Sequence, residues 1–296
     1  MTSARILSVA LLVCACVLTS KTFAQSTGDI RVIRDVSYKA DASTEYERER
    51  CKLDWYLPVE GTDDFPVLIW FHGGGLQQGH KADDIATAVA ERFAKDGIAV
   101  ASVNYRLSPQ VNYPAYLEDA AAAVAFVLKN ASQHRGRNDQ VFVSGHSAGG
   151  YLTAMVAMDP SLLEAHGATR NSLAGIIPVS GQMITHSTVR NERGIPRSQP
   201  IIDEAAPAYH ATADAPPFLC IVGSEDLPAR TEENQYFAAA MKAAGHDSVS
   251  YSEFEGRDHG TIANRMGEPD DEVAAAIKAF IAATIEERSR GTSSSR

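Results

Sequence analysis

Apolar residues along this chain fall into short runs of two kinds. Polar and apolar residues alternate over 31–38 and 52–57, as expected of strands near the open edge of a sheet. Later runs are almost continuously apolar, which is typical of strands buried on both faces of a parallel sheet. These later runs cover residues 66–71, 97–105, 140–145, 174–180 and 217–223, and a further strand is predicted over 248–254.

Between the strands, apolar residues recur at the spacing of one helix face. Gly245 ends one of these helical patterns. Strands that alternate with helices predict an α/β fold: a mostly parallel sheet of about eight strands, with right-handed crossovers and helices on both faces. The helices are marked by Leu117, Ala121, Val124 and Leu128, by Phe237, Met241 and Ala244, and by Val273, Ile277, Phe280 and Ile281.

The first residues have the pattern of an export signal. Arg5 precedes an apolar run over 6–18, and residues 22–24 offer a small-x-small cleavage site. The run is shorter than the roughly 20 residues that cross a bilayer as a helix, so no stable membrane insertion is expected after cleavage. Residues 1–24 are therefore predicted to be a secretory signal peptide, and the protein to be periplasmic or secreted. A lipoprotein acylated at Cys16 is the minor alternative.

The remaining chain is predicted to form a single domain over residues 25–290. Only residues 181–215 interrupt its alternation of strands and helices, because this segment is polar, rich in proline and longer than a usual connection. It is interpreted as a small cap or lid. Residues 291–296, which include three serines, are predicted to be a disordered tail.

The charge of the chain argues against nucleic acid as a partner. The full sequence has 27 basic and 37 acidic residues. Loss of Arg5 and Lys21 with the leader leaves 25 basic residues, a net charge of −12 (25 − 37). Binding a polyanion requires a basic face, so a small-molecule partner is expected instead.

Two pairs of residues bear on the predicted core. Cys51 begins an early strand and Cys220 lies in a late buried one, which favours two separate buried thiols over a single disulfide, although an exported protein permits either. Arg106 and Asp119 place opposite charges close to the core. Because buried charges must be paired, we interpret them as a structural ion pair.

Small residues flank one serine where a predicted strand meets a predicted helix. Gly145 and Gly149 lie on either side of Ser147, after the strand at 140–145 and before a helical stretch at 151–158. The glycines let the backbone pass close to its neighbours while the serine is held out on a tight turn at the carboxyl edge of the sheet. Gly-x-Ser-x-Gly also occurs by chance, and a serine here can be a simple helix N-cap, but a preceding strand and a following helix favour a nucleophile. His146 fills the variable position of the motif.

A nucleophilic serine needs a base. His259 follows the strand at 248–254 and so returns to the carboxyl edge beside Ser147. His246 precedes that strand, which places it at the opposite, amino edge. His259 is therefore the predicted base.

The base needs a carboxylate that orients it. The loop after the strand at 217–223 contains Glu225 and Asp226 at the same edge of the sheet. We choose Asp226, with Glu225 as the fallback. Asp258 is less favoured because it adjoins the histidine in sequence.

Three glycines follow His72 at the end of the strand at 66–71. Backbone without side chains can present N–H groups to a substrate oxygen, so Gly73 and Gly74, together with the N–H of Ala148, are predicted to form an oxyanion hole. His72 is expected to brace this loop. A phosphate cradle is not indicated, because the chain lacks Gly-Lys-Ser/Thr here and no Gly-x-Gly-x-x-Gly opens a helix.

These motifs resemble those of the α/β-hydrolase fold and, within it, the bacterial carboxylesterase and lipase family related to hormone-sensitive lipase. The resemblance implies Ser147 as nucleophile, Asp226 as acid and His259 as base. Family members often have an aromatic residue after the glycine run, where this chain has Leu76, Gln77 and Gln78, so the wall on the acyl side is expected to be unusual. The matching motifs are His-Gly-Gly-Gly at 72–75, Asn-Tyr-Arg-Leu-Ser-Pro at 104–109, Tyr-Pro-Ala-Tyr-Leu-Glu-Asp at 113–119, Gly-His-Ser-Ala-Gly at 145–149, Gly-Ser-Glu-Asp-Leu-Pro at 223–228 and Gly-Arg-Asp-His at 256–259.

The sequence therefore predicts an exported serine hydrolase that cleaves carboxylic esters of small to medium size through an acyl-enzyme. One alternative uses the same residues on another bond, as an arylformamidase, a peptidase or a polysaccharide deacylase. A second alternative is a binding protein of the same fold without catalysis. No cofactor is implied. No metal is implied either, because the chain has no His-Glu-x-x-His motif and no paired-cysteine site.

Overall fold

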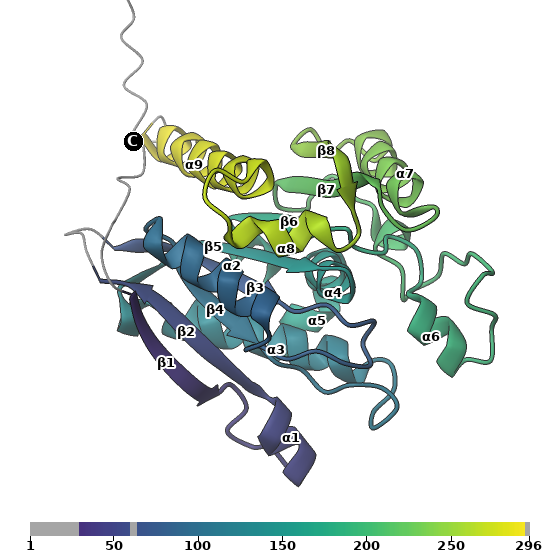
Figure 1. The fold of residues 1–296 in the computed structure, drawn as a ribbon, viewed down its shortest axis with the longest axis horizontal. Helices are drawn as coiled ribbons and strands as arrows, with labels where there is room; N and C mark the ends of the chain where they lie inside the picture. Colours follow the sequence, from purple (N-terminus) through teal and green to yellow (C-terminus); the bar gives the residue numbers. More distant parts are fainter. Residues whose placement is uncertain (1–29, 60–63, 294–296) are drawn as a thin grey trace, which may run out of the picture.

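The computed structural model describes residues 30–59 and 64–293, and the predicted signal peptide lies outside them. Eight strands form one sheet in the order β1-β2-β4-β3-β5-β6-β7-β8 (Figure 1). β1 and β2 are antiparallel to their neighbours, and the pairings from β4 through β8 are parallel. The predicted fold class is confirmed. The strands are β1 Ile30–Ser37, β2 Lys52–Pro58, β3 Phe65–Phe71, β4 Ala99–Val103, β5 Gly136–His146, β6 Gly175–Val179, β7 Phe218–Glu225 and β8 Val249–Asp258.

Helices cover both faces of the sheet (Figure 1). α2, α8 and α9 pack on one face, and α3, α4, α5 and α7 pack on the other. None of the helices in the described part of the chain combines the length and apolar character needed to cross a membrane. The α-helices are α1 Glu45–Arg50, α2 Asp84–Lys95, α3 Ala115–Asn130, α4 Ala148–Met158, α5 Pro160–Glu164, α6 Ser187–Glu192, α7 Arg230–Ala243, α8 Thr261–Asn264 and α9 Glu272–Ser293; the 3-10 helices are η1 Ala131–His134, η2 Arg170–Ser172, η3 Pro207–His210 and η4 Arg265–Gly267.

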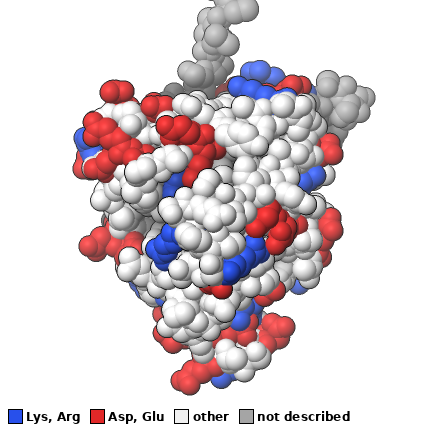
Figure 2. Space-filling view, turned by 90° about the vertical axis from the view of Figure 1, so that its right-hand side faces the viewer, with Lys and Arg blue, Asp and Glu red and all other residues white. Residues whose placement is uncertain are grey.

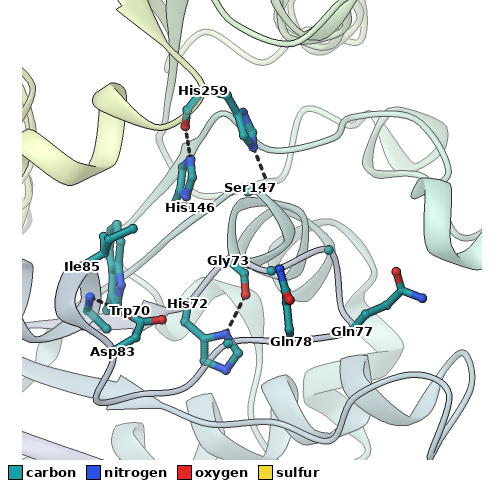
Figure 3. Close-up of a pocket in the computed structure, with 14 residues that line it drawn as sticks. Trp70, His72, Gly73, Gln77, Gln78, Asp83, Ile85, His146, Ser147 and His259 are labelled. Atoms are coloured by element: carbon teal, nitrogen blue, oxygen red, sulfur yellow. Dashed lines mark hydrogen bonds between the residues drawn. The ribbon is translucent and has the colours of Figure 1, made fainter.

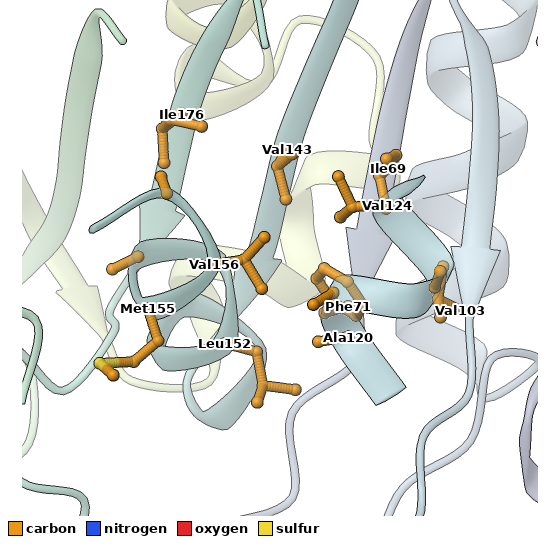
Figure 4. Close-up of a cluster of buried hydrophobic side chains, with 14 of the residues drawn as sticks. Ile69, Phe71, Val103, Ala120, Val124, Val143, Leu152, Met155, Val156 and Ile176 are labelled. Atoms are coloured by element: carbon orange, nitrogen blue, oxygen red, sulfur yellow. The ribbon is translucent and has the colours of Figure 1, made fainter. Parts of the chain in front are cut away.

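The side chains of β3 show why the central strands are continuously apolar. Val67, Ile69 and Phe71 belong to the core cluster under α3 and α4, which Figure 4 shows in part. Leu68 and Trp70 point to the opposite face and join the cluster under α2 and α9. Successive side chains on a strand point to opposite faces. In a strand covered on both sides, all of them are buried, which favours a continuous apolar run.

Several boundaries differ from the pattern-based prediction. β5 begins at Gly136, four residues before the apolar run, because Gly136 pairs with Phe65 although residues 137–139 are polar. α2 was not among the predicted helices; it is capped by Asp83, whose carboxylate accepts a hydrogen bond from the Ala86 N–H at 2.8 Å. The backbone of α9 continues to Ser293, three residues into the predicted tail.

Residues 181–215, the segment predicted to form a small cap, contain α6 and η3 (Figure 1). Two side chains fasten it to the loop after β3. The Thr188 hydroxyl donates to the Gly75 carbonyl at 2.6 Å, and Arg197 donates to the Gln77 side chain at 2.8 Å. The cap is therefore attached directly to the predicted oxyanion loop.

Cys51 and Cys220, the cysteines within the described residues, are free and buried, as predicted. Burial raises the pKa of the Cys51 thiol to about 12 and that of Cys220 to about 12. Protonated thiols are poor nucleophiles, so these cysteines have a packing role at neutral pH.

The predicted ion pair of Arg106 and Asp119 is confirmed. Two hydrogen bonds of 2.7 Å join the guanidinium to the fully buried carboxylate, and Lys39 adds a third contact to Asp119 at 2.8 Å. Glu47 lies in the same network, where its hydrogen bond from Lys39 lowers its pKa to about 2 despite partial burial. Glu47, Cys51 and Asp119 are close enough together to offer ligand atoms to a metal, but the two cations already neutralise the carboxylates.

We expect Asp119→Ala to lower the free energy of unfolding by about 3–5 kcal/mol, because it leaves two partly buried cations with Glu47 as their one shared counter-charge. Urea denaturation measures this change. Arg137→Ala is the control, since it breaks the exposed Arg137–Asp139 pair and should cost under about 1 kcal/mol. Equal losses in the two variants would contradict the role of burial.

Candidate active site

Ser147 lies between the last residue of β5 and the first residue of α4. Its backbone has φ 57° and ψ −114°, a conformation that non-glycine residues rarely adopt and that costs energy. Its N–H donates to the Val179 carbonyl at 2.9 Å, which fixes the turn against β6. A methyl group added at Gly149 would lie 2.0 Å from the Phe71 carbonyl oxygen, so only glycine permits this close approach of α4 to β3.

The predicted triad residues come together at the carboxyl edge of the sheet. The Ser147 hydroxyl donates to Nε2 of His259 at 2.8 Å (Figure 3). Nδ1–H of His259 donates to Asp226 Oδ1 at 2.7 Å, a tautomer assigned from these partners. Asp226 follows β7 and His259 follows β8, so neighbouring parallel strands place the acid beside the base.

The Asp226 carboxylate is suited to orient a base. Burial alone would raise its pKa, but hydrogen bonds from His259 and Ser180 outweigh burial, and the pKa of Asp226 is lowered. The Leu227 N–H adds a further hydrogen bond at 2.7 Å. The acid is therefore ionised at neutral pH and can stabilise a positive charge on His259.

The alternative residues have other surroundings. Glu225 is exposed at the end of β7. Asp258 caps the next turn by accepting from the N–H groups of Gly260 and Thr261. His246 is buried before β8, where it donates to the Pro216 carbonyl at the amino edge of the sheet.

The backbone N–H groups of Gly73, Gly74 and Ala148 have no acceptor among residues 30–59 and 64–293. Gly74 has φ +104°, and a side chain there would meet the Gln78 carbonyl at 2.1 Å. The free donors of a helix N-terminus and of a glycine loop attract negative charge. The three N–H groups are thus available to a substrate oxygen, as an oxyanion hole requires.

His72 lies beneath this loop. Its Nδ1–H donates to the Gly73 carbonyl at 2.7 Å (Figure 3). Its ring stacks on Tyr105 with centroids 4.3 Å apart. The Tyr105 hydroxyl donates to the His72 carbonyl at 2.9 Å. Burial lowers the pKa of His72 to about 3, so it stays neutral. These contacts place His72 in a bracing position.

His146 contacts the base, which the sequence reasoning missed. Its Nε2–H donates to the backbone carbonyl of His259 at 2.7 Å, and the two rings lie 4.8 Å apart (Figure 3). Burial, followed by the nearby charge of His259, lowers the pKa of His146 to about 3. The one signal for this contact in the sequence was the place of His146 inside the Gly-x-Ser-x-Gly motif, because a polar side chain at that position lies close to Ser147.

An open cleft of about 620 Å³ adjoins the serine. Of the three residues that follow the glycine run, Leu76 has φ 61° and a side chain fully buried in the core. Gln77 and Gln78 line the cleft (Figure 3). The lining residues are Trp70, His72, Gly73, Gly74, Gly75, Gln77, Gln78, Gly79, Asp83, Ile85, Ala86, His146, Ser147 and His259.

The buried neutral histidines predict loss of stability in acid. His72 and His146 have pKa values of about 3 when folded, against about 6.5 in an unfolded chain. Between these values the unfolded state binds more protons, so each histidine costs about 1.4 kcal/mol of stability per pH unit as the pH falls from 6.5. We expect His146→Gln to reduce the slope of unfolding free energy against pH by the contribution of one histidine, about 1.4 kcal/mol per pH unit. Denaturation at pH 4–7 measures the slope, and an unchanged slope would contradict this account.

The chain is similar in sequence to known proteins. A family model described as BD-FAE matches residues 53–176, which include Ser147. The esterase LipC of Mycobacterium tuberculosis is 30% identical over 224 residues, which cover 70% of this chain and 55% of that protein. The chain thus spans about half the length of the curated relatives it matches.

Solved structures share the fold. Esterase B from Lactobacillus rhamnosis has a TM-score of 0.73 at 18% identity, covering 90% of this chain and 89% of that chain. A truncated carbohydrate esterase from gut microbiota has a TM-score of 0.71 at 19% identity, covering 89% of this chain and 99% of that chain. With its motifs and sheet topology, the chain has the α/β-hydrolase fold and is similar to carboxylesterases such as LipC.

Proposed function

We propose that this protein is an exported serine hydrolase that cleaves carboxylic esters of small to medium size through an acyl-enzyme. The observation that supports this most directly is the continuous chain of hydrogen bonds from Ser147 through His259 to Asp226, at 2.8 and 2.7 Å. A serine hydroxyl is a weak nucleophile on its own, and a positioned imidazole backed by a carboxylate overcomes that weakness.

In the first half of the reaction, Oγ of Ser147 attacks the ester carbonyl carbon while Nε2 of His259 accepts the hydroxyl proton. The carbonyl oxygen becomes an oxyanion, to which the N–H groups of Gly73, Gly74 and Ala148 donate. Asp226 stabilises the imidazolium through Nδ1–H. The tetrahedral intermediate then collapses: the bond to the alcohol oxygen breaks, and His259 returns the proton to the departing alkoxide.

In the second half, water replaces the alcohol. His259 accepts a proton from the water, whose oxygen attacks the acyl carbon of the Ser147 ester. The same N–H groups stabilise the second oxyanion, and each contributes about 3 kcal/mol to lowering the barrier. Collapse of this intermediate releases the carboxylic acid and returns the proton to the serine.

The cleft favours short or polar substrates. Its apolar side chains are those of Trp70, Ile85 and Ala86, and Gln77, Gln78 and Asp83 add polar groups beside them. A long acyl chain gains affinity from apolar walls that remove it from water. We therefore propose acyl groups of a few carbons as the preferred substrates.

Partners and location form part of the same proposal. On the face shown in Figure 2, acidic side chains are interspersed with Lys and Arg instead of forming a basic surface. Together with the net charge of −10, this supports a small-molecule ester over nucleic acid. The leader pattern of residues 1–24 supports export.

Ser147→Ala should reduce turnover of p-nitrophenyl butyrate at least about 10³-fold, because the nucleophile is lost. The variant should also fail to react with a fluorophosphonate probe. Ser172→Ala, which changes an exposed serine of η2, serves as the matched control and should behave like the wild type. Undiminished turnover in Ser147→Ala would exclude the proposed mechanism.

Ester and amide hydrolysis are distinguished by paired substrates with one acyl group. We expect kcat/KM to be at least about 10²-fold higher for the p-nitrophenyl ester than for the p-nitroanilide. The amide nitrogen must be protonated as it departs, and His259 is the group positioned for that step. Within the esters, butyrate should be preferred to palmitate. A preference for the anilide would replace the esterase proposal by the amide hydrolase alternative.

A further inference from the structure

The end of β6 lies between the nucleophile and the acid. The Val179 carbonyl accepts the N–H of Ser147 at 2.9 Å. The next residue, Ser180, donates its hydroxyl to Asp226 Oδ2 at 2.5 Å. Two consecutive residues of one strand end therefore contact both ends of the triad.

Ser180 is held in an unusual conformation. It is fully buried and has φ 50°, in the region that favours glycine. Its N–H donates to the Ile221 carbonyl at 2.7 Å, and the guanidinium of Arg230 donates to its own carbonyl. The first turns of α7 secure the following residue as well, since Asn234 donates to the Gly181 carbonyl at 2.9 Å. Backbone strain that neighbouring bonds enforce in this way is characteristic of functional sites.

The Asp226 carboxylate needs an anchor on its second oxygen. Oδ1 accepts from Nδ1 of His259 and from the Leu227 N–H, both at 2.7 Å. Oδ2 accepts from Ser180, and within the described residues no second donor to Oδ2 is found. The terminal torsion of an aspartate is soft, so these Oδ1 contacts alone leave the carboxylate plane free to turn.

We propose that Ser180 is a positioning residue whose hydroxyl fixes the carboxylate plane of Asp226, so that Oδ1 faces His259. This inference rests on the proposed function. An ionised carboxylate only accepts hydrogen bonds, so the single hydroxyl proton of Ser180 is committed to Asp226. Ser180 is therefore not a second nucleophile, although it lies at the same edge of the sheet as Ser147.

Two variants separate the hydroxyl from the backbone strain. Ser180→Ala removes the hydroxyl and keeps a Cβ at positive φ, whereas Ser180→Gly removes both the hydroxyl and the strain. Ser102→Ala is the matched control. Ser102, in β4, is also fully buried, and its hydroxyl donates one hydrogen bond to the Lys81 carbonyl at 2.7 Å. Thermal unfolding, kcat and KM on p-nitrophenyl butyrate, and the far-downfield proton NMR signal of the His259 Nδ1–H are measured for each. His259→Gln assigns that signal.

We expect kcat to fall about tenfold in both Ser180 variants, with KM little changed, since the substrate contacts remain and only the base is misaligned. The NMR signal of His259 should broaden or vanish in both, because its hydrogen bond to Asp226 is no longer held. Ser180→Gly should unfold at a higher temperature than Ser180→Ala. Ser102→Ala should keep wild-type kcat and the signal.

Recovery of kcat and the signal in Ser180→Gly would show that strain alone matters and would overturn the proposal. Wild-type values in both variants would overturn it too. If the wild-type protein hydrolyses no ester, the proposed function fails. The NMR comparison then still decides whether Ser180 positions Asp226.

Discussion

The contact between the start of α4 and the end of β3 constrains the whole carboxyl edge. Gly149 brings the two backbones so close that the Phe71 carbonyl occupies the place of a side chain. This approach sets the strained turn of Ser147 and leaves the first N–H groups of α4 beside the glycine loop that continues from β3. Ser147 and the proposed oxyanion donors are therefore positioned by the backbone.

The acid and the base are positioned differently, by side chains and loops. Asp226 and His259 follow neighbouring strands, and parallel pairing brings their loops together. Ser180 and His146 then refine their orientation, one through the carboxylate and the other through the His259 backbone. Both contacts come from the ends of β5 and β6, so the sheet supports the loops that carry Asp226 and His259.

The sequence predicted the features that follow from topology. Continuous apolar runs identify parallel strands, and their order along the chain is enough to bring Ser147, Asp226 and His259 to one edge of the sheet. Contacts that depend on side-chain direction were not predictable. Leu76 has φ 61° and lies in the core, so of the three residues after the glycine run only Gln77 and Gln78 line the cleft. The role of Ser180 was not predictable for the same reason, because it depends on the contact between its hydroxyl and the Asp226 carboxylate.

The hydrogen bonds from Thr188 to Gly75 and from Arg197 to Gln77 couple the cap to the loop of oxyanion donors. Exchange of this segment would therefore also release the loop that carries the proposed oxyanion donors. A foreign segment grafted in its place would need hydroxyl and guanidinium donors at equivalent points to keep that loop in position.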